Sequence, residues 1–228
     1  MRLLPLLLIS LFGVTVVSGF IVGGYGGGRG SSSSSSSEEH GHGHRPPRPR
    51  PPPRPRPPRR CEAGWMSFNR TAGRWCVKVF NGGRLAQHTA EELCQGQGAT
   101  LTGLQTINER VQVANAGRLI SNANGGGFAE IWLGATRRHG CNRRIDCTPL
   151  NTFQWTDGHT TGTAGMFYPG PEPNAVWFKK WGNQNCLELH VSVADGVLAR
   201  YRYPHASLDD QHCQQTEVRL YACGKLAK

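Results

Sequence analysis

Eight cysteines constrain this chain more than any other feature, because all of them lie after residue 60. They stand at positions 61, 76, 94, 141, 147, 186, 213 and 223 of 228. An even number of cysteines in an exported chain predicts a disulfide framework, although the sequence alone leaves the pairing open. We therefore expect four disulfides and no free thiol.

The first residues are typical of a secretory signal peptide. Met1 and Arg2 precede an apolar stretch from Leu3 to Val17, and the small residues Ser18 and Gly19 follow it. The stretch is too short to favour a membrane anchor, and no second run of comparable apolarity follows. We predict a signal peptide over residues 1–19 and a secreted, extracellular mature chain without a membrane span.

Residues 20–60 have too little apolar surface to form a packed core. Glycine-rich and serine-rich sequence leads to His40, His42 and His44, and a Pro/Arg tract runs from Arg45 to Arg60. This composition predicts a disordered arm that is flexible in its Gly/Ser part and stiffer in its Pro/Arg part. Eight arginines against two glutamates (8 − 2) give the arm a charge of +6.

The basic arm has two interpretations. It can bind anionic polysaccharide by charge pairing, or it can be a solvated spacer, since no aromatic residue interrupts its Pro/Arg tract. Its three histidines can share a zinc or copper ion, although a plain low-complexity tail is the simpler interpretation.

The remaining domain, residues 61–228, contains two helix signals. Thr89-Ala90-Glu91-Glu92 has the form of a capping box and predicts a short helix that Gly96 and Gly98 end. Thr106-Ile107-Asn108-Glu109 repeats the device before a longer helix that the Asn/Gly cluster at 122–127 stops. The expected apolar face of this second helix consists of Val111, Val113, Ala114, Leu119 and Ile120.

Short apolar runs elsewhere in the domain predict antiparallel strands. An aromatic hairpin is expected between Cys61 and Cys76, and further strands are expected at 131–134, 153–155, 186–189, 196–199 and 218–223. Two helices followed by short strands indicate an α+β domain. The long stretch from Thr156 to Asn185 is expected to be functional or held by a ligand.

Side-chain oxygens cluster at two places in this second half. Glu172 and Asn174 flank Pro173, while Asp209 and Asp210 come just before Cys213. Carboxylate and amide oxygens are the ligands that calcium prefers. A disulfide near these clusters would bring them together, which predicts a calcium site.

The order of these motifs resembles the C-type lectin domain family over essentially the whole of residues 61–223. Ile131-Trp132-Leu133-Gly134 is similar to the family's core strand, and Trp155-Thr156-Asp157-Gly158 is similar to the turn into its long loop. Glu172-Pro173-Asn174 resembles its mannose-type motif. The resemblance implies a disulfide-stapled C-type lectin-like fold with two helices, small antiparallel sheets and a long loop that binds calcium and ligand.

The resemblance also implies a disulfide pairing. It pairs Cys61 with Cys76, Cys94 with Cys223 and Cys186 with Cys213, which leaves Cys141 to pair with Cys147 in a small basic loop. Three tryptophans are expected in the core, namely Trp65, Trp132 and Trp155.

The resemblance assigns a role to each oxygen donor. Glu172 and Asn174 would form an acid–amide pair that recognises a sugar hydroxyl, with Pro173 in the cis form. The second pair in the family is a glutamate and an asparagine, whereas this chain has Gln184 and Asp209 at those positions. The expected metal ligands are Glu172, Asn174, Gln184, Asp209 and Asp210, and all except Asp210 are also expected to bind carbohydrate.

Aromatic residues near these donors leave alternatives open. Trp177, Phe178 and Trp181 can stack against a sugar, but packing of at least two of them in the core is the favoured interpretation. Tyr168 and Leu208 stand where the family has tryptophan, so a calcium-free domain that binds protein is a competing hypothesis.

The sequence thus predicts a secreted, non-enzymatic lectin that requires calcium and binds mannose-type glycans. The sequence contains neither a phosphate-binding glycine loop nor a nucleophile elbow, so no such motif indicates an enzyme. The alternative is a calcium-independent module that binds protein or polyanion through its arm. Asn69-Arg70-Thr71 is an N-glycosylation sequon, so we predict a glycan on Asn69.

Overall fold

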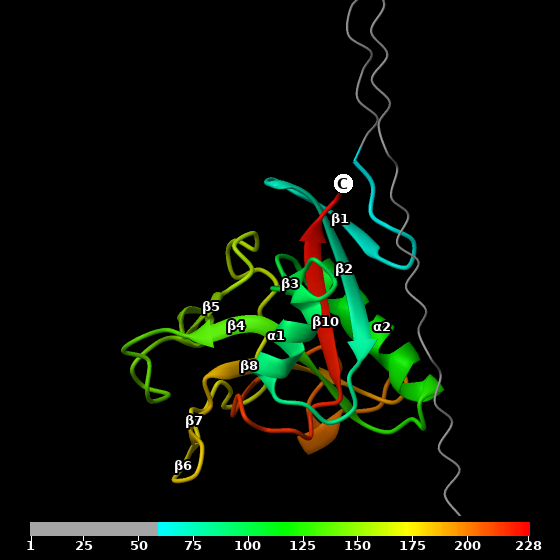
Figure 1. The fold of residues 1–228 in the computed structure, drawn as a ribbon. Coiled ribbons are helices and arrows are strands. Elements are labelled where there is room, and N and C mark those ends of the chain that lie inside the picture. Colours follow the sequence, from blue (N-terminus) through cyan, green and yellow to red (C-terminus); the bar gives the residue numbers. More distant parts are fainter. Residues whose placement is uncertain (1–58) are drawn as a thin grey trace, which may run out of the picture. The chain divides into compact units, whose positions relative to one another are not determined.

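The computed structural model describes residues 59–228, and the predicted signal peptide and residues 20–58 of the predicted arm lie outside this part of the chain. Its two helices lie in the first half of this range and most of its strands follow them, so it is an α+β domain, which confirms the predicted class (Figure 1). The strands are β1 (Met66–Arg70), β2 (Gly73–Asn81), β3 (Thr100–Leu101), β4 (Ala129–Arg137), β5 (Phe153–Trp155), β6 (Trp177–Phe178), β7 (Gly182–Asn183), β8 (Cys186–Val191), β9 (Leu208–Gln211) and β10 (Leu220–Leu226). The helices are α1 (Gln87–Gln95) and α2 (Ile107–Ala123), with 3₁₀ turns η1 (Pro149–Asn151) and η2 (Arg200–Arg202). Neither helix of the described range combines the length and the apolarity that a bilayer crossing needs.

The last strand of the chain, β10, lies in the middle of the main sheet. The strand order is β1-β2-β10-β4-β8-β9, with β3 paired to β10 and β5 paired to β4. β10 runs antiparallel to β2 and parallel to β4, where Leu220 lies opposite Ile131. The two ends of the domain therefore meet, and the Arg60 N–H donates to the Lys228 carbonyl at 2.9 Å.

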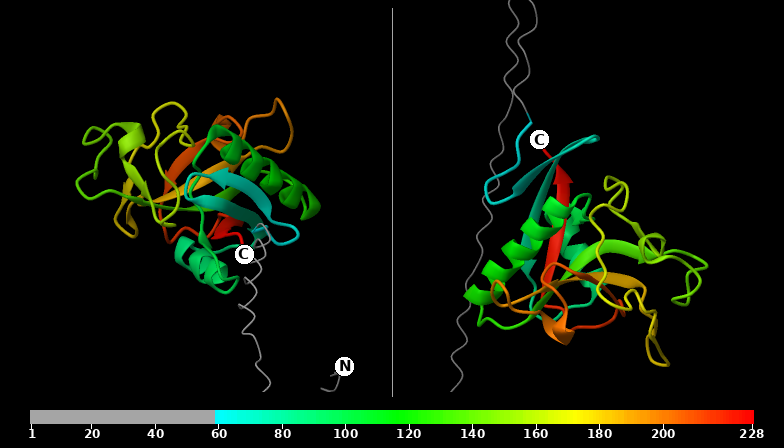
Figure 2. Two further views of the ribbon diagram at one scale, coloured as in Figure 1. Left: turned by 90° about the horizontal axis from the view of Figure 1, so that it is seen from above. Right: turned by 180° about the vertical axis from the view of Figure 1, so that it is seen from behind.

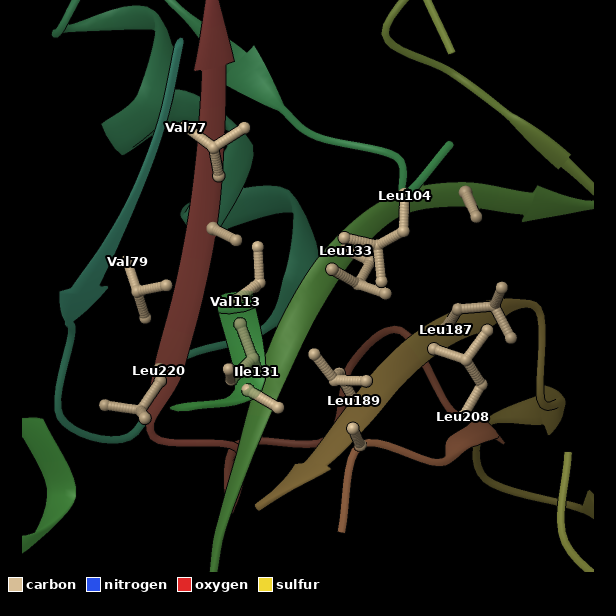
Figure 3. Close-up of a cluster of buried hydrophobic side chains, with 14 of the residues drawn as sticks. Val77, Val79, Leu104, Val113, Ile131, Leu133, Leu187, Leu189, Leu208 and Leu220 are labelled. Carbon is tan, nitrogen blue, oxygen red and sulfur yellow. The ribbon is translucent and has the colours of Figure 1, made fainter. Parts of the chain in front are cut away.

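The two helices cover opposite faces of this sheet (Figures 1 and 2). Because side chains alternate along a strand, Ile131 and Leu133 of β4 join the core under α2, whereas Trp132 joins the cluster under α1. Figure 3 shows the first core, in which leucines and isoleucine of β4, β8 and β10 gather near Val113 of α2. Of the three tryptophans expected in the core, Trp132 is fully buried, while Trp65 and Trp155 are half-buried at its edges.

The buried side of α2 differs in part from the expected one. Val113 and Ala114 are buried as predicted and Ile120 packs against the core, but Val111 and Leu119 are exposed to 37% and 73%. The sheet instead meets the helix along the row that contains Gly117, where an added Cβ would lie 2.6 Å from the Ile131 Cδ1 atom. Residues 111 and 119 fall outside this row because of the helical period.

Only one of the two predicted capping boxes begins a helix. Thr106 is the N-cap of α2, and its hydroxyl accepts a hydrogen bond from the Glu109 N–H at 3.1 Å. The prediction for Thr89 was wrong, because α1 begins two residues earlier at Gln87 and its N-cap, Ala86, offers no side-chain oxygen. The pattern at Thr89 occurs inside the first turn of the helix, where the Ala90 N–H already donates to the Ala86 carbonyl at 3.1 Å.

The strand predictions were right for the core and wrong near residue 200. The runs at 131–134, 153–155, 186–189 and 218–223 lie in or overlap strands, but 196–199 is a loop that turns at Gly196 with a φ of +71°. The strand β9 was missed because its Asp209-Asp210-Gln211 sequence is polar. It pairs antiparallel with β8 and forms an edge of the sheet.

All four disulfides form as the family resemblance implied. The bonds are Cys61–Cys76, Cys94–Cys223, Cys141–Cys147 and Cys186–Cys213, and no cysteine is free in the described residues. Cys94–Cys223 ties α1 to the central strand, whereas Cys186–Cys213 ties β8 to the segment after β9. The second of these bonds holds the carboxylates of β9 beside the long loop.

The long loop between β5 and β8 is fixed to the domain at its start and in its middle. The Asp157 carboxylate accepts hydrogen bonds from the N–H groups of Gly103, His159 and Thr160 at 2.7–2.9 Å. Farther along, the Phe167 carbonyl accepts a bond from the Leu208 N–H at 2.8 Å. The loop is therefore held against the edge strand β9, where Glu172 can reach the aspartates.

The two capping-box sequences provide a matched test. We expect Thr106→Ala to lower the free energy of unfolding by about 1 kcal/mol, because the Glu109 N–H would lose its partner. Thr89→Ala should change it little, because Thr89 lies inside α1. Urea unfolding of both variants measures the difference, and equal losses would contradict these helix starts.

Candidate functional site

The predicted oxygen donors meet at one pocket beside the edge strand β9. A cavity of about 180 Å³ is lined by Glu172, Asn174, Gln184, Tyr201, Tyr203, Asp209 and Gln211. Glu172 and Asn174 come from the long loop, where the Glu172–Pro173 peptide bond is cis as expected. Asp210 does not line the pocket and is completely buried behind it. Consecutive side chains of a strand point to opposite faces, so only one of the two aspartates opens into the pocket.

Three carboxylates come close together at this pocket. Oxygens of Glu172, Asp209 and Asp210 lie within 4.8 Å of one another, and the three residues are at most 6% exposed. The Asp209 Oδ1 atom is buried without a hydrogen-bond partner. A buried carboxylate oxygen without a donor is costly, and a metal cation would satisfy it. The donor set, with carboxylates and amides, fits calcium.

Hydrogen bonds within the loop hold Glu172 and the two amides. The Asn174 side chain donates from Nδ2 to Glu172 Oε1 at 2.8 Å, and the Asn174 N–H donates to Glu172 Oε2 at 3.0 Å. The Tyr203 hydroxyl also donates to Glu172. The Val176 N–H donates to the side-chain oxygens of Gln184 and Asn174 at 2.9 and 3.1 Å. These bonds orient the acid and the two amides before any ligand arrives.

Arg137, the last residue of β4, was not expected at the site. Its guanidinium is buried and donates to Asp210 Oδ2, to the Gln184 carbonyl at 2.8 Å and to the Cys141 carbonyl at 3.0 Å. Asp210 also accepts the N–H groups of Asn174 and Ala175, both at 2.8 Å. Arg137 therefore joins the small disulfide loop, the segment between β7 and β8, and the edge strand in one network.

Arg137 already neutralises one of the three carboxylates. When all are ionised, three negative charges and one positive charge leave a net charge of −2, which a divalent cation would balance. Burial, and then the charge of Asp210, raises the pKa of Asp209 to about 7. Burial raises the pKa of Asp210 to about 6 even beside Arg137, and it also raises the pKa of Glu172. The site is thus electrostatically costly without a further cation.

Several residues at this site had only weak signals in the sequence. Tyr201 and Tyr203 come from the segment between β8 and β9, which was expected to contain a strand and not a pocket wall. The only sequence signal for Arg137 at this site was its place near the end of the predicted strand that contains Trp132. Gln211 follows the two aspartates in β9, and its alternation with Asp209 places it at the same pocket.

The loop aromatics are more exposed than expected. Trp177 and Phe178 form β6, which pairs only with β7, and they are 63% and 53% exposed. Trp181 is half-buried, with its ring centroid 5.4 Å from that of His212. The expectation that at least two of the three pack in the core was wrong, because this two-stranded hairpin stands apart from the main sheet (Figure 1).

Asn69, the predicted glycosylation site, lies exposed on β1.

Comparison with known proteins identifies this architecture. Residues 66–225 match the family model described as C-type lectin domain-containing protein 141/158. No curated protein matches the chain significantly. Similar solved structures include human lithostathine, with 18% identity over 74% of this chain and 92% of that chain and a TM-score of 0.48. A calcium-independent type II antifreeze protein is also similar, with 18% identity over 75% of this chain and 97% of that chain and a TM-score of 0.47. So is the cow C-type carbohydrate-recognition domain of CD23, with 16% identity over 75% of this chain and 98% of that chain and a TM-score of 0.46.

The buried ion pair offers a stability test. Arg137→Ala would leave the buried Asp210 carboxyl group without its partner, so we expect the free energy of unfolding to fall by about 3–5 kcal/mol. Arg138→Ala is the matched control, because that neighbouring side chain is exposed. Denaturant unfolding measures both variants. A loss at Arg137 as small as that at Arg138 would show that the pair does not hold the site together.

Proposed function

Because the chain belongs to the C-type lectin domain-containing protein 141/158 family, we propose that it is a secreted protein that binds glycans in a calcium-dependent manner. The proposed metal ligands are Glu172, Asn174, Gln184, Asp209 and Asp210. The role is one of binding and not of catalysis, and the four disulfides support an extracellular location.

One observation carries the calcium proposal. The unpartnered Asp209 Oδ1 atom lies in a group of three carboxylates that has only one buried guanidinium beside it. A divalent cation would give this oxygen a partner and would balance the remaining charge. The side chains of four of the proposed ligands also line a single pocket, so a ligand of that cation would be reachable from solvent.

The same side chains can recognise sugar hydroxyls. Calcium, when bound, supplies coordination positions for two adjacent hydroxyl oxygens. A carboxylate can accept the proton of such a hydroxyl while an amide N–H donates to its oxygen. Glu172 and Asn174 form one acid–amide pair, and Asp209 with Gln184 forms the other. Asp209 is shorter than glutamate, but it projects from a rigid strand that is fixed to β8.

The Glu-Pro-Asn sequence favours mannose-type ligands within the family. We therefore propose sugars with mannose-like 3- and 4-hydroxyls, such as mannose, N-acetylglucosamine, glucose or fucose. The exposed Trp177 and Phe178 precede Gln184 in the same loop and offer flat apolar surface for a sugar face. Recognition of foreign glycans in innate defence is an extension of this proposal.

A second candidate function follows from Arg137. Its guanidinium already serves as the cation of Asp210, so the fold at this position does not depend on calcium. Under this alternative the domain binds protein or polyanion without calcium, and the basic arm at 20–60 supplies charge. Binding through the arm would weaken steeply with salt, whereas calcium-dependent sugar binding would be lost with chelator.

Retention on immobilised mannan tests the proposal. The full secreted chain is applied at moderate salt with calcium and then with chelator, beside Asn174→Asp. Asn108→Asp makes the same chemical change on the exposed first turn of α2 and serves as the control. We expect retention that needs calcium, and a loss of at least tenfold for Asn174→Asp alone.

Other outcomes separate the two candidates. Calcium binding without retention would make mannan the wrong ligand, while a chain that binds no calcium contradicts the lectin mechanism. Retention that ignores chelator but disappears at high salt would support the arm-dependent alternative.

A further inference from the structure

A second polar cluster lies beside the pocket, on one face of three neighbouring strands. Glu188 and His190 are two residues apart on β8 and therefore share a face. In the strand register, Glu188 lies opposite Asp209 of β9, and His190 lies opposite Glu130 of β4. Residues directly opposite on paired strands have Cβ atoms about 4.5–5.5 Å apart. The sheet thus brings three acids and one imidazole together.

These side chains are buried although they point away from the leucine core. Glu188 is 1% exposed, His190 is fully buried, and Glu130 and Asp209 are 4% and 6% exposed. The segment between β8 and β9 folds over them, and the rings of Tyr203 and Tyr201 approach the His190 ring with centroids 5.2 and 6.1 Å away. The alternation Leu187-Glu188-Leu189-His190 would ordinarily predict a solvated polar face.

The donor atoms converge on one point. The His190 Nε2 atom lies 3.4 Å from Asp209 Oδ2 and 3.7 Å from Glu188 Oε1. All three donors lie within 4.8 Å of one another. Ligands around a tetrahedral zinc ion, with bonds of about 2.0–2.1 Å, are separated by roughly 3.3–3.4 Å. Small side-chain movements would bring these three atoms to that spacing.

The protein itself satisfies this cluster only in part. His190 Nε2 lies within hydrogen-bond distance of Asp209 Oδ2, and Arg200 Nη1 lies 3.9 Å from Glu130 Oε1. One polar atom of each cluster side chain nevertheless has no hydrogen-bond partner. Glu188 Oε2, His190 Nδ1, Asp209 Oδ1 and Glu130 Oε1 are all buried without a hydrogen-bond partner. Buried polar atoms nearly always have a partner, so four of them in one place indicate that a component is missing. Water alone would leave neighbouring carboxylates to repel each other, whereas a cation would bind them together.

We propose that Glu188, His190 and Asp209 form a binding site for a divalent transition metal, with zinc as the metal that fits best. An imidazole with two carboxylates suits zinc, whereas calcium prefers oxygen ligands alone. A water molecule from the pocket that Asp209 lines would complete four ligands. Glu130, opposite His190, would accept the proton of the second imidazole nitrogen, as acids behind metal-bound histidines do.

The zinc site goes beyond the proposed sugar site and does not depend on it. Asp209 is common to both sites, but Glu188 and His190 do not line the sugar pocket, and Glu172 is outside the zinc cluster. Zinc would hold one Asp209 oxygen from inside the domain and thereby orient this side chain in the pocket.

Zinc titration of the metal-free, full secreted chain tests the site, with a chromophoric chelator as competitor. The background variant carries His40→Gln, His42→Gln and His44→Gln, so that the arm contributes no imidazole. We expect one zinc ion per chain in this background, and a loss of affinity of at least tenfold on adding Glu188→Gln or His190→Gln. His88→Gln is the matched control, because it removes an exposed imidazole of α1 and should leave zinc affinity within about twofold.

A second measurement covers variants that fail to fold. X-ray absorption of the zinc-loaded background chain should show nitrogen and oxygen ligands at about 2.0–2.1 Å, including one imidazole. No zinc binding in the background chain, an unchanged affinity in both Glu188→Gln and His190→Gln, or a spectrum without imidazole would each overturn the proposal. Loss of mannan retention with zinc binding intact would count against the sugar site alone.

Discussion

The domain is organised around β10, which is the last of the described strands in chain order. β10 pairs with β2 on one side and with β4 on the other, so neither half of the main sheet is complete until the C-terminal residues arrive. Cys94–Cys223 then fixes α1 to this strand, and β3 pairs with it as well. Beyond β4, β8 and the edge strand β9 continue the main path of the sheet, and β5 pairs with β4 beside them. The candidate sites are built at this far edge, where long segments can fold against the strands without interrupting the core.

At that edge the balance of charge decides what the site can hold. A single buried arginine serves three carboxylates beside the pocket. The neighbouring polar face adds Glu188 of β8 and Glu130 of β4, with one buried imidazole between the strands and the partly exposed Arg200 beside Glu130. Hydrophobic packing behind the strands keeps these groups in place, because Leu187, Leu189 and Leu208 fill the opposite face. A stable core thus supports a region that is unfavourable by itself, which is typical of binding sites.

The sequence predicted the fold and the pocket better than it predicted their surroundings. The cysteines, the tryptophan-containing strand and the Glu-Pro-Asn motif have strong local signals, and the structure places the predicted donors together as expected. The polar strand β9 and the buried Glu188 and His190 lacked such signals, since alternating polar residues ordinarily face water. Their burial depends on a covering segment whose path is set by tertiary contacts. Likewise, the sequence at Thr89 matches a capping box, but the helix begins two residues earlier, at Gln87.

The two ends of the domain lie together, and this has a consequence for how the pocket is presented. Arg60 and Lys228 are joined by a hydrogen bond at one end of the domain, while the β6–β7 hairpin and the η2 turn lie at the opposite end (Figure 1). A support, a partner or a second domain joined directly to either end of this domain would therefore leave the pocket facing outward. Several copies anchored by their ends would point their pockets in a common direction, so that weak single contacts would add up on a surface with repeated ligands.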